Sequence, residues 1–200
     1  MRLSLGRVAK AQKLEQEVYD LTEKILARRP GDLHALSDRT FAAQLLGELA
    51  NRQHDPAAAA DYAIKAAKAG EDEVRFNPSD LGAWQRWTLA LSTGAEFKFE
   101  RGEIAEAIAT MRSLLALEQD KRRPSSLGPV IWYHWLNLAV WQAQTGDSIA
   151  AAASLKSFLR DVSQLLAQLA PGDLRRQILA KADLARDGLE LSEGETQAAL

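Results

Sequence analysis

The sequence has no cysteine and few aromatic residues, and it also lacks long apolar runs. Without cysteine the chain can form neither disulfides nor thiolate metal sites, which fits a reducing compartment. Its first residues do not contain the seven or more consecutive apolar residues of a signal-peptide core, and no run approaches the roughly 18–20 apolar residues of a membrane span. We therefore expect a cytoplasmic protein with no membrane partner.

The chain also lacks an excess of positive or negative charge, because its formal net charge is only −2. The basic cluster Lys121–Arg123 is too short to attract a polyanion, so nucleic acid is not expected as a partner. The three histidines stand apart in the sequence, and no metal, nucleotide or nucleophile motif is present. We expect no enzyme activity, no cofactor and no metal.

The residues that are abundant favour helices. Hydrophobic residues make up 46% of the chain. Alanine, leucine, glutamate, glutamine, lysine and arginine are frequent, and they lose little rotamer freedom in a helix, whereas the β-branched and aromatic residues typical of strands are scarce. The fold class predicted is all-α.

One short pattern recurs four times and divides the chain. It consists of a proline followed three residues later by leucine, at Pro30, Pro78, Pro124 and Pro171, and the prolines lie 48, 46 and 47 residues apart. A fixed period of about 20–50 residues indicates a stacked array of one supersecondary unit. We predict a single α-solenoid domain over residues 1–191, with joints near these prolines, and a flexible tail over 192–200.

Apolar spacing and helix-capping residues predict about eight helices between these joints. Asp32, Asp55 and Asp80 are the expected N-caps, with Pro56 at a first helical position. The predicted helices are 7–29, 32–52, 57–76, 81–101, 103–120, 127–145, 148–170 and 173–191, the last of them a capping helix.

Small residues recur around the three predicted hairpin turns at His54, Gly102 and Gly146. Seven positions before each turn lie Gly47, Ala95 and Ala139, and five positions after it lie Ala59, Ala107 and Ala151. Small side chains at both places allow the two helices of a hairpin to cross closely.

These small positions resemble those of the tetratricopeptide repeat (TPR) family. The third unit matches best, since Trp135, Leu138 and Ala139 follow the first-helix signature and Ala151 with Leu155 the second; Leu46-Gly47 matches in the first unit. The period of about 47 residues exceeds the 34 usual for the family, and a HEAT-like or other α-hairpin array remains an alternative. The resemblance implies a right-handed superhelix whose first helices line a concave, partner-binding face.

For this chain, the resemblance implies a concave face that could accept a basic or amide-bearing peptide. Tyr133 and Phe99 would be its apolar anchors. A merely solvated polar face is the alternative. The partner-binding residues expected are Gln44, Glu48, Asn51, Ser92, Glu96, Phe99, Tyr133 and Gln144, together with Leu136 and Val140.

The tryptophan pairs Trp84/Trp87 and Trp132/Trp135 occupy equivalent places, and we expect them to pack in the core rather than bind a partner. His134 is expected to have a structural role, with its ring N–H donating a hydrogen bond within the fold. The function predicted is a protein–protein interaction scaffold. The alternatives are a ligand- or peptide-sensing regulatory domain of a larger bacterial signalling protein, and self-association through the ends of the array.

Overall fold

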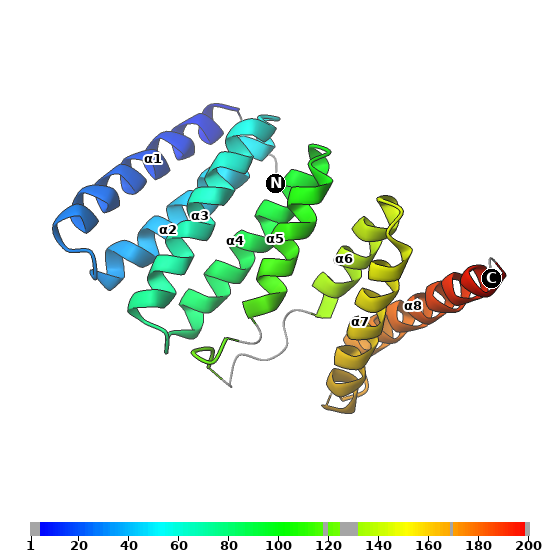
Figure 1. Cartoon of the computed structure of the whole chain (residues 1–200). Coiled ribbons are helices and arrows are strands. Elements are labelled where there is room, and N and C mark those ends of the chain that lie inside the picture. The colour runs from blue at the N-terminus through cyan, green and yellow to red at the C-terminus, as the bar shows by residue number, and fades with distance from the viewer. Residues whose placement is uncertain (1–4, 118–119, 125–131, 169, 199–200) are drawn as a thin grey trace. The chain divides into compact units, whose positions relative to one another are not determined.

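The computed structural model describes residues 5–117, 120–124, 132–168 and 170–198, and this part of the chain contains eight helices and no strand (Figure 1). The all-α prediction is confirmed. The helices are α1 (Leu5–Arg28), α2 (Leu33–Arg52), α3 (Pro56–Phe76), α4 (Leu81–Glu100), α5 (Ile104–Ala116), α6 (Trp132–Gln144), α7 (Ser148–Gln168) and α8 (Asp173–Ala198).

The chain divides into two compact units, Met1–Leu127 with helices α1–α5 and Gly128–Leu200 with α6–α8. Inside each unit, every helix packs on the helix that follows it in sequence, which is the pattern of an α-solenoid. In the first unit α2 also touches α4. These are the first helices of two successive hairpins, which we call the outgoing helices, and they are therefore neighbours. That residues 1–191 form a single domain stays a prediction.

The predicted helix starts agree with the structure to within two residues wherever the structure describes them, the largest difference being at α1, which starts at Leu5 instead of residue 7. The carboxylate of Asp32 accepts a hydrogen bond from the backbone N–H of Ala35 at 3.1 Å, and that of Asp80 accepts one from Gly82 at 2.8 Å. These bonds satisfy N–H groups that a helix leaves free at its first turn. Pro56 lies at the first turn of α3, as expected.

Some predicted ends were wrong. Helix α5 ends at Ala116 instead of continuing to residue 120, and α8 continues to Ala198 instead of ending at residue 191. The start predicted at residue 127 lies outside the described residues.

The three hairpin turns have the same backbone conformation. His54 (φ 59°), Gly102 (φ 80°) and Gly146 (φ 80°) are all left-handed. The residue after each turn donates its backbone N–H to the carbonyl five residues back, namely Asp55 to Ala50, Glu103 to Lys98 and Asp147 to Gln142. This is the Schellman arrangement of a helix C-terminus.

The residue after each turn is also the N-cap of the second helix of the hairpin, which we call the return helix. The Asp55 carboxylate accepts from the N–H of Ala58, and the Asp147 carboxylate accepts from that of Ala150, each at 3.0 Å. Glu103 makes no such side-chain bond. Each turn therefore ends one helix and begins the next within two residues, and this defines the position at which the hairpin reverses direction.

Helix α1 buries only part of the apolar stripe that its spacing predicts. Val8 is buried and Ile25 is half-buried, but the three residues between them on that stripe are not. Leu14, Val18 and Leu21 are 51%, 40% and 58% exposed, while Thr22 and Leu26 are buried. A terminal helix has a neighbour on one side only, and α1 turns a different side toward α2. The apolar spacing identified a helix but not the side that packs.

Close contact between helices in the first unit depends on small residues of α3. Ala59, Ala63 and Ala66 are at most 4% exposed. A Cβ added at Gly70 would lie 2.8 Å from Trp87 Cα, closer than side chains approach a backbone. Helices α3 and α4 therefore touch backbone to backbone at this point. All six small residues predicted around the turns are buried.

The second unit has a core of its own between α7 and α8. It contains Phe158 and Val162 of α7, together with Ile178 and Ala182 of α8, all at most 1% exposed. Trp135 packs against this cluster.

We predict that His54→Gly stabilises the protein by about 0.5–1 kcal/mol. A non-glycine residue in the left-handed region carries a cost of about 1–2 kcal/mol, which exceeds the extra chain entropy that glycine loses on folding. Urea unfolding followed by circular dichroism measures the change. Gly102→Ala is the matched reverse substitution and should destabilise by a similar amount; a destabilised His54→Gly variant would contradict the prediction.

We predict that Gly70→Ala destabilises the protein by about 1–3 kcal/mol, although alanine is the better helix former, because overpacking forces α3 away from Trp87. Gly94→Ala is the control, since its added Cβ meets only the Cβ of Ala63, at an ordinary 3.5 Å. The control should be neutral or stabilising in the same unfolding measurement. Equal effects of the two substitutions on stability would show that the close contact between Gly70 and Trp87 is not the cause of the destabilisation.

Candidate functional site

Two of the predicted partner-binding residues make contacts within the fold. Gln44 of α2 is half-buried, and its side-chain amide donates to the backbone carbonyl of Arg86 in α4 at 2.7 Å. Ser92 is only 5% exposed. Gln44 therefore joins the two neighbouring outgoing helices, and Ser92 is largely shielded from a partner.

The predicted carboxylates do reach the surface. Glu48 is exposed and forms an ion pair with Arg52 one turn later, at 3.8 Å between Oε2 and Nη2. Glu96 is exposed on α4; desolvation, and to a lesser degree the charge of Glu100, raise its pKa, while a hydrogen bond with Ser92 acts in the opposite direction. Asn51 is exposed at the end of α2.

Two apolar residues that the sequence reasoning missed lie on the same faces as these carboxylates. Phe41 of α2 and Leu89 of α4 are 59% and 54% exposed. Each precedes a carboxylate, Glu48 or Glu96, by seven residues, which is almost two full helical turns. Phe41 and Leu89 are themselves 48 residues apart, as the two carboxylates are, so the same pair of side chains is repeated in both helices.

A small hollow lies between α2 and α4 on this side. It is lined by Gln44, Gly47 and Glu48 of α2 and by Leu89, Thr93 and Phe97 of α4, with Ala63, Ala66 and Ala90 at its base. We call the surface of Phe41, Glu48, Leu89, Thr93 and Glu96 the outgoing-helix face. The predicted Phe99 is half-buried near the end of α4.

The other predicted residues belong to the second unit. Tyr133 is half-buried, and its ring centroid lies 3.8 Å from that of His134. Gln144 is exposed at the end of α6, and Val140 is 48% exposed. Tyr133 is thus partly engaged in packing on its own helix.

The first tryptophan pair is structural, as predicted. Trp84 is fully buried and its indole N–H donates to the carbonyl of Pro78 at 2.9 Å. Trp87 is 9% exposed, with its ring centroid 5.6 Å from that of Trp84. The side chain of Trp132, in the second pair, is not among those that the structure describes.

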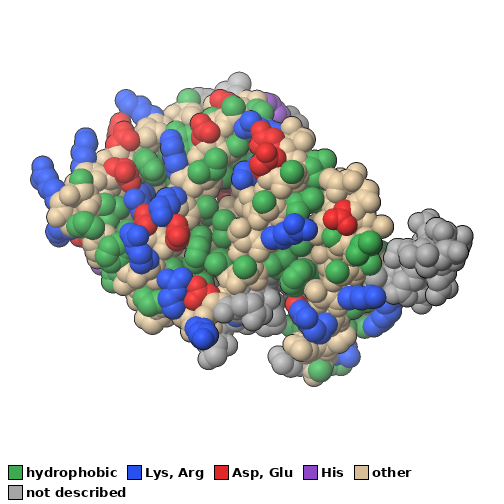
Figure 2. Space-filling model, in the orientation of Figure 1, with side chains coloured by type: hydrophobic (Ala, Val, Ile, Leu, Met, Phe, Trp, Pro, Cys, Tyr) green, Lys and Arg blue, Asp and Glu red, His purple; other side chains and the backbone are tan. Residues whose placement is uncertain are grey.

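A larger cleft, which the sequence did not predict, lies on the other side of the first unit, where α4 passes beneath α3 and α5. Its volume is about 350 Å³. Figure 2 shows hydrophobic side chains gathered in the hollow between these helices. The lining residues are Ala63, Ile64 and Ala67 of α3, Ala90, Leu91, Gly94 and Lys98 of α4, and Glu106, Ala109, Thr110 and Ser113 of α5.

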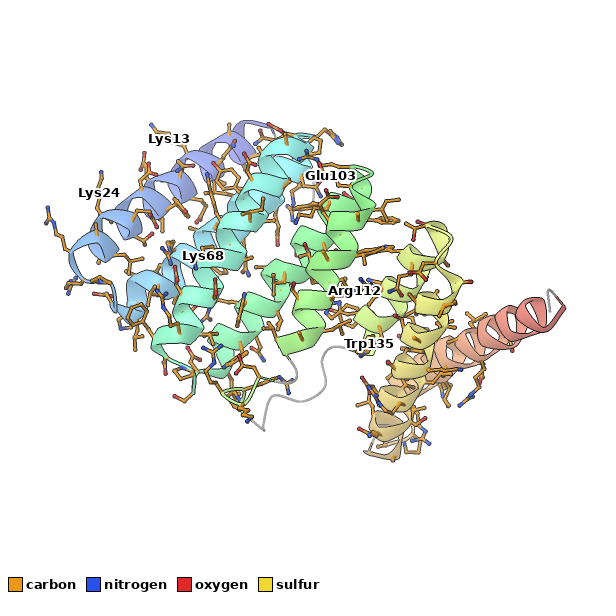
Figure 3. All side chains as sticks on the ribbon, in the orientation of Figure 1. Lys13, Lys24, Lys68, Glu103, Arg112 and Trp135 are labelled. Atoms are coloured by element: carbon orange, nitrogen blue, oxygen red, sulfur yellow. The ribbon has the colours of Figure 1, made fainter. Side chains whose placement is uncertain are left out.

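Ion pairs hold α2, α3 and α4 together around α3. Arg39 of α2 contacts Asp72 of α3 at 3.0 Å, and Arg86 of α4 contacts Glu73, whose side chain is only 3% exposed. Lys68, labelled in Figure 3, pairs with Glu71 at 2.8 Å on the outer side of the same helix. The pairs of Arg39 with Asp72 and of Arg86 with Glu73 join helices, whereas Lys68 and Glu71 form an exposed pair on one helix.

Metal and membrane sites do not emerge from the part of the chain that the structure covers. No three histidine, aspartate or glutamate side chains in it converge where they could hold a metal ion. None of its helices combines the length and the apolar character needed to cross a bilayer.

Comparison with known proteins gives one similar solved structure to report. No family model matches the chain, and no curated protein matches it. The chain is similar to the crystal structure of MamA, at 13% sequence identity and a TM-score of 0.39, with all of both chains covered. Similarity at that level assigns neither an activity nor a partner to this chain.

His134 makes the stability of the protein depend on pH. It is 2% exposed, and its Nδ1 has no hydrogen-bond partner among the described residues, so it is buried as expected but is not satisfied at this nitrogen. Burial lowers its pKa from 6.5 to about 4. Between these values the unfolded chain binds a proton that the folded chain does not, so stability falls as the pH falls through this window.

We predict that this group removes about 2 kcal/mol of stability between about pH 7 and pH 5, and that His134→Leu abolishes that part of the loss. Urea unfolding at both pH values measures it. His34→Gln, at an exposed position, is the control and should keep the wild-type dependence. An unchanged pH dependence in His134→Leu would show that His134 does not titrate in this way.

Proposed function

We propose that this chain is a non-enzymatic protein–protein interaction module of the TPR type, which binds a peptide or protein segment on the outgoing-helix face. The partner segment carries basic or amide side chains next to apolar ones. Such a module would act in the cytoplasm, as part of a scaffold or a signalling assembly.

One observation carries the proposal. Phe41 with Glu48, and Leu89 with Glu96, place an exposed apolar side chain and an exposed carboxylate at matching positions of two neighbouring helices. A single exposed leucine needs no explanation, but the recurrence of the pair after 48 residues is what a binding face built from repeats requires.

The two kinds of side chain would have different roles. Peptide segments are held mainly by a few apolar anchors, and charges at the edge determine orientation and exclude wrong partners. Phe41 and Leu89 are available as contacts for such anchors. Glu48 and Glu96 would select lysine or arginine, and Glu48 already pairs with an arginine of its own chain.

Contacts between helices beneath this face connect the two helices that carry it. Gln44 bonds α2 to the backbone of α4, and the buried pair of Glu73 with Arg86 ties α4 to α3. The spacing between the two helices is therefore set before a partner arrives, which lowers the entropy cost of binding.

We predict that peptides selected by the wild-type protein from a random display library are enriched in lysine or arginine next to apolar residues. The double variant Glu48→Lys/Glu96→Lys should bind a selected peptide about tenfold more weakly, because two attractive charges become repulsive. Fluorescence polarisation with the labelled peptide measures the affinity, and circular dichroism confirms that the variant is folded.

The double variant Asp61→Lys/Glu71→Lys is the matched control. Both residues are exposed on α3, away from the outgoing-helix face, and the net charge changes equally. It should keep most of the affinity. An equal loss in both variants would mean that only total charge matters, and selected peptides without basic residues would contradict the proposed specificity.

A further inference from the structure

The larger cleft of the first unit contains a lysine, Lys98, that forms no ion pair with any residue that the structure describes. Lys98 of α4 lies in the wall of the cleft, and its ammonium donates to the hydroxyl of Thr110 in α5 at 2.9 Å. Among the described residues this is its one polar contact. An ammonium has three N–H donors, so two are left for a ligand.

The remainder of the cleft is apolar. Its floor consists of the buried Ala63, Ala90 and Gly94, and Leu91 and Ile64 form parts of its walls, Ile64 being 57% exposed. A volume of about 350 Å³ lies within the range of roughly 300–1,000 Å³ in which proteins bind small molecules. Apolar walls with one oriented cation favour a ligand that has an apolar chain and a single negative group.

Glu106 limits the charge that the cleft accepts. It also lines the cleft, is exposed, and forms no ion pair with Lys98 in the structure. Thr110, one turn further along α5, donates its hydroxyl to the backbone carbonyl of Glu106 at 2.8 Å and so presents its oxygen to Lys98. A ligand with one carboxylate meets Lys98 with a modest repulsion from Glu106, whereas a multiply charged anion meets a larger one.

We propose that this cleft is a binding site for a small monocarboxylic acid with an unbranched apolar chain. The carboxylate binds the ammonium of Lys98, and the chain lies over the alanine and glycine floor between α3 and α5. The site is on a different side of the unit from the outgoing-helix face, so it does not depend on the peptide-binding function.

Octanoate is a suitable probe, since it has this chemistry and stays monomeric in water. Isothermal titration calorimetry on the full chain should show saturable binding of octanoate, and octanol or octylamine should bind at least tenfold more weakly. Lys98→Gln should lose about tenfold in affinity, and Lys98→Arg should keep most of it. Absence of octanoate binding, or equal binding of octanol, overturns the proposal.

Two further variants keep the test decisive if Lys98→Gln does not fold. Lys24→Gln removes the same charge from an exposed position of α1, labelled in Figure 3, and should bind octanoate like the wild type. Glu106→Gln removes the repulsive carboxylate and should bind octanoate about two- to threefold more tightly. Equal losses in Lys24→Gln and Lys98→Gln, or weaker binding by Glu106→Gln, overturn the proposed position of the carboxylate.

Discussion

The first unit depends on the close contact of α3 with the helices on either side of it. The backbone of Trp87 leaves no room for a Cβ at Gly70, and Ala63 and Ala66 are buried along the same helix. Because helix axes approach only as far as the side chains between them allow, this run of small residues sets the spacing of α2, α3 and α4. Ala63 and Ala90 form the base of the small hollow and of the larger cleft alike, so one contact shapes both surfaces.

The turns determine how far each helix extends. At His54, Gly102 and Gly146 one left-handed residue ends a helix, and the next residue begins the return helix. With both ends defined by hydrogen bonds, equivalent residues of successive hairpins are placed at equivalent heights. Phe41 and Leu89, 48 residues apart in the chain, therefore lie at equivalent positions of their hairpins, each seven residues before a carboxylate.

Much of this local structure could be predicted from the sequence, because it depends on residues close together in the chain. The caps at Asp32 and Asp80, the turn glycines and the buried small residues follow from local chemistry. What could not be predicted depends on neighbours. Apolar spacing does not say which side of α1 packs, and nothing local to Gln44 shows that it reaches the Arg86 carbonyl of another helix. The larger cleft combines side chains from three helices and therefore has no linear motif.

The charges of the first unit differ between its two sides, although the chain as a whole is nearly neutral. Carboxylates alone stand on the outgoing-helix face, whereas the cleft between α3 and α5 is lined by a lysine, Lys98, as well as by Glu106, and these two form no ion pair with each other in the structure. Most other charged residues around α3, such as Arg39, Asp72 and Arg86, are paired with one another and hold helices together. Ion pairs of this kind, formed between helices, contribute to the fold. The pair of Glu48 with Arg52 is different, because both residues are on α2 and both side chains are exposed, so Glu48 stays accessible to a partner. Net charge therefore says little about what a repeat protein binds, and the sign of the charge beside each apolar hollow says more.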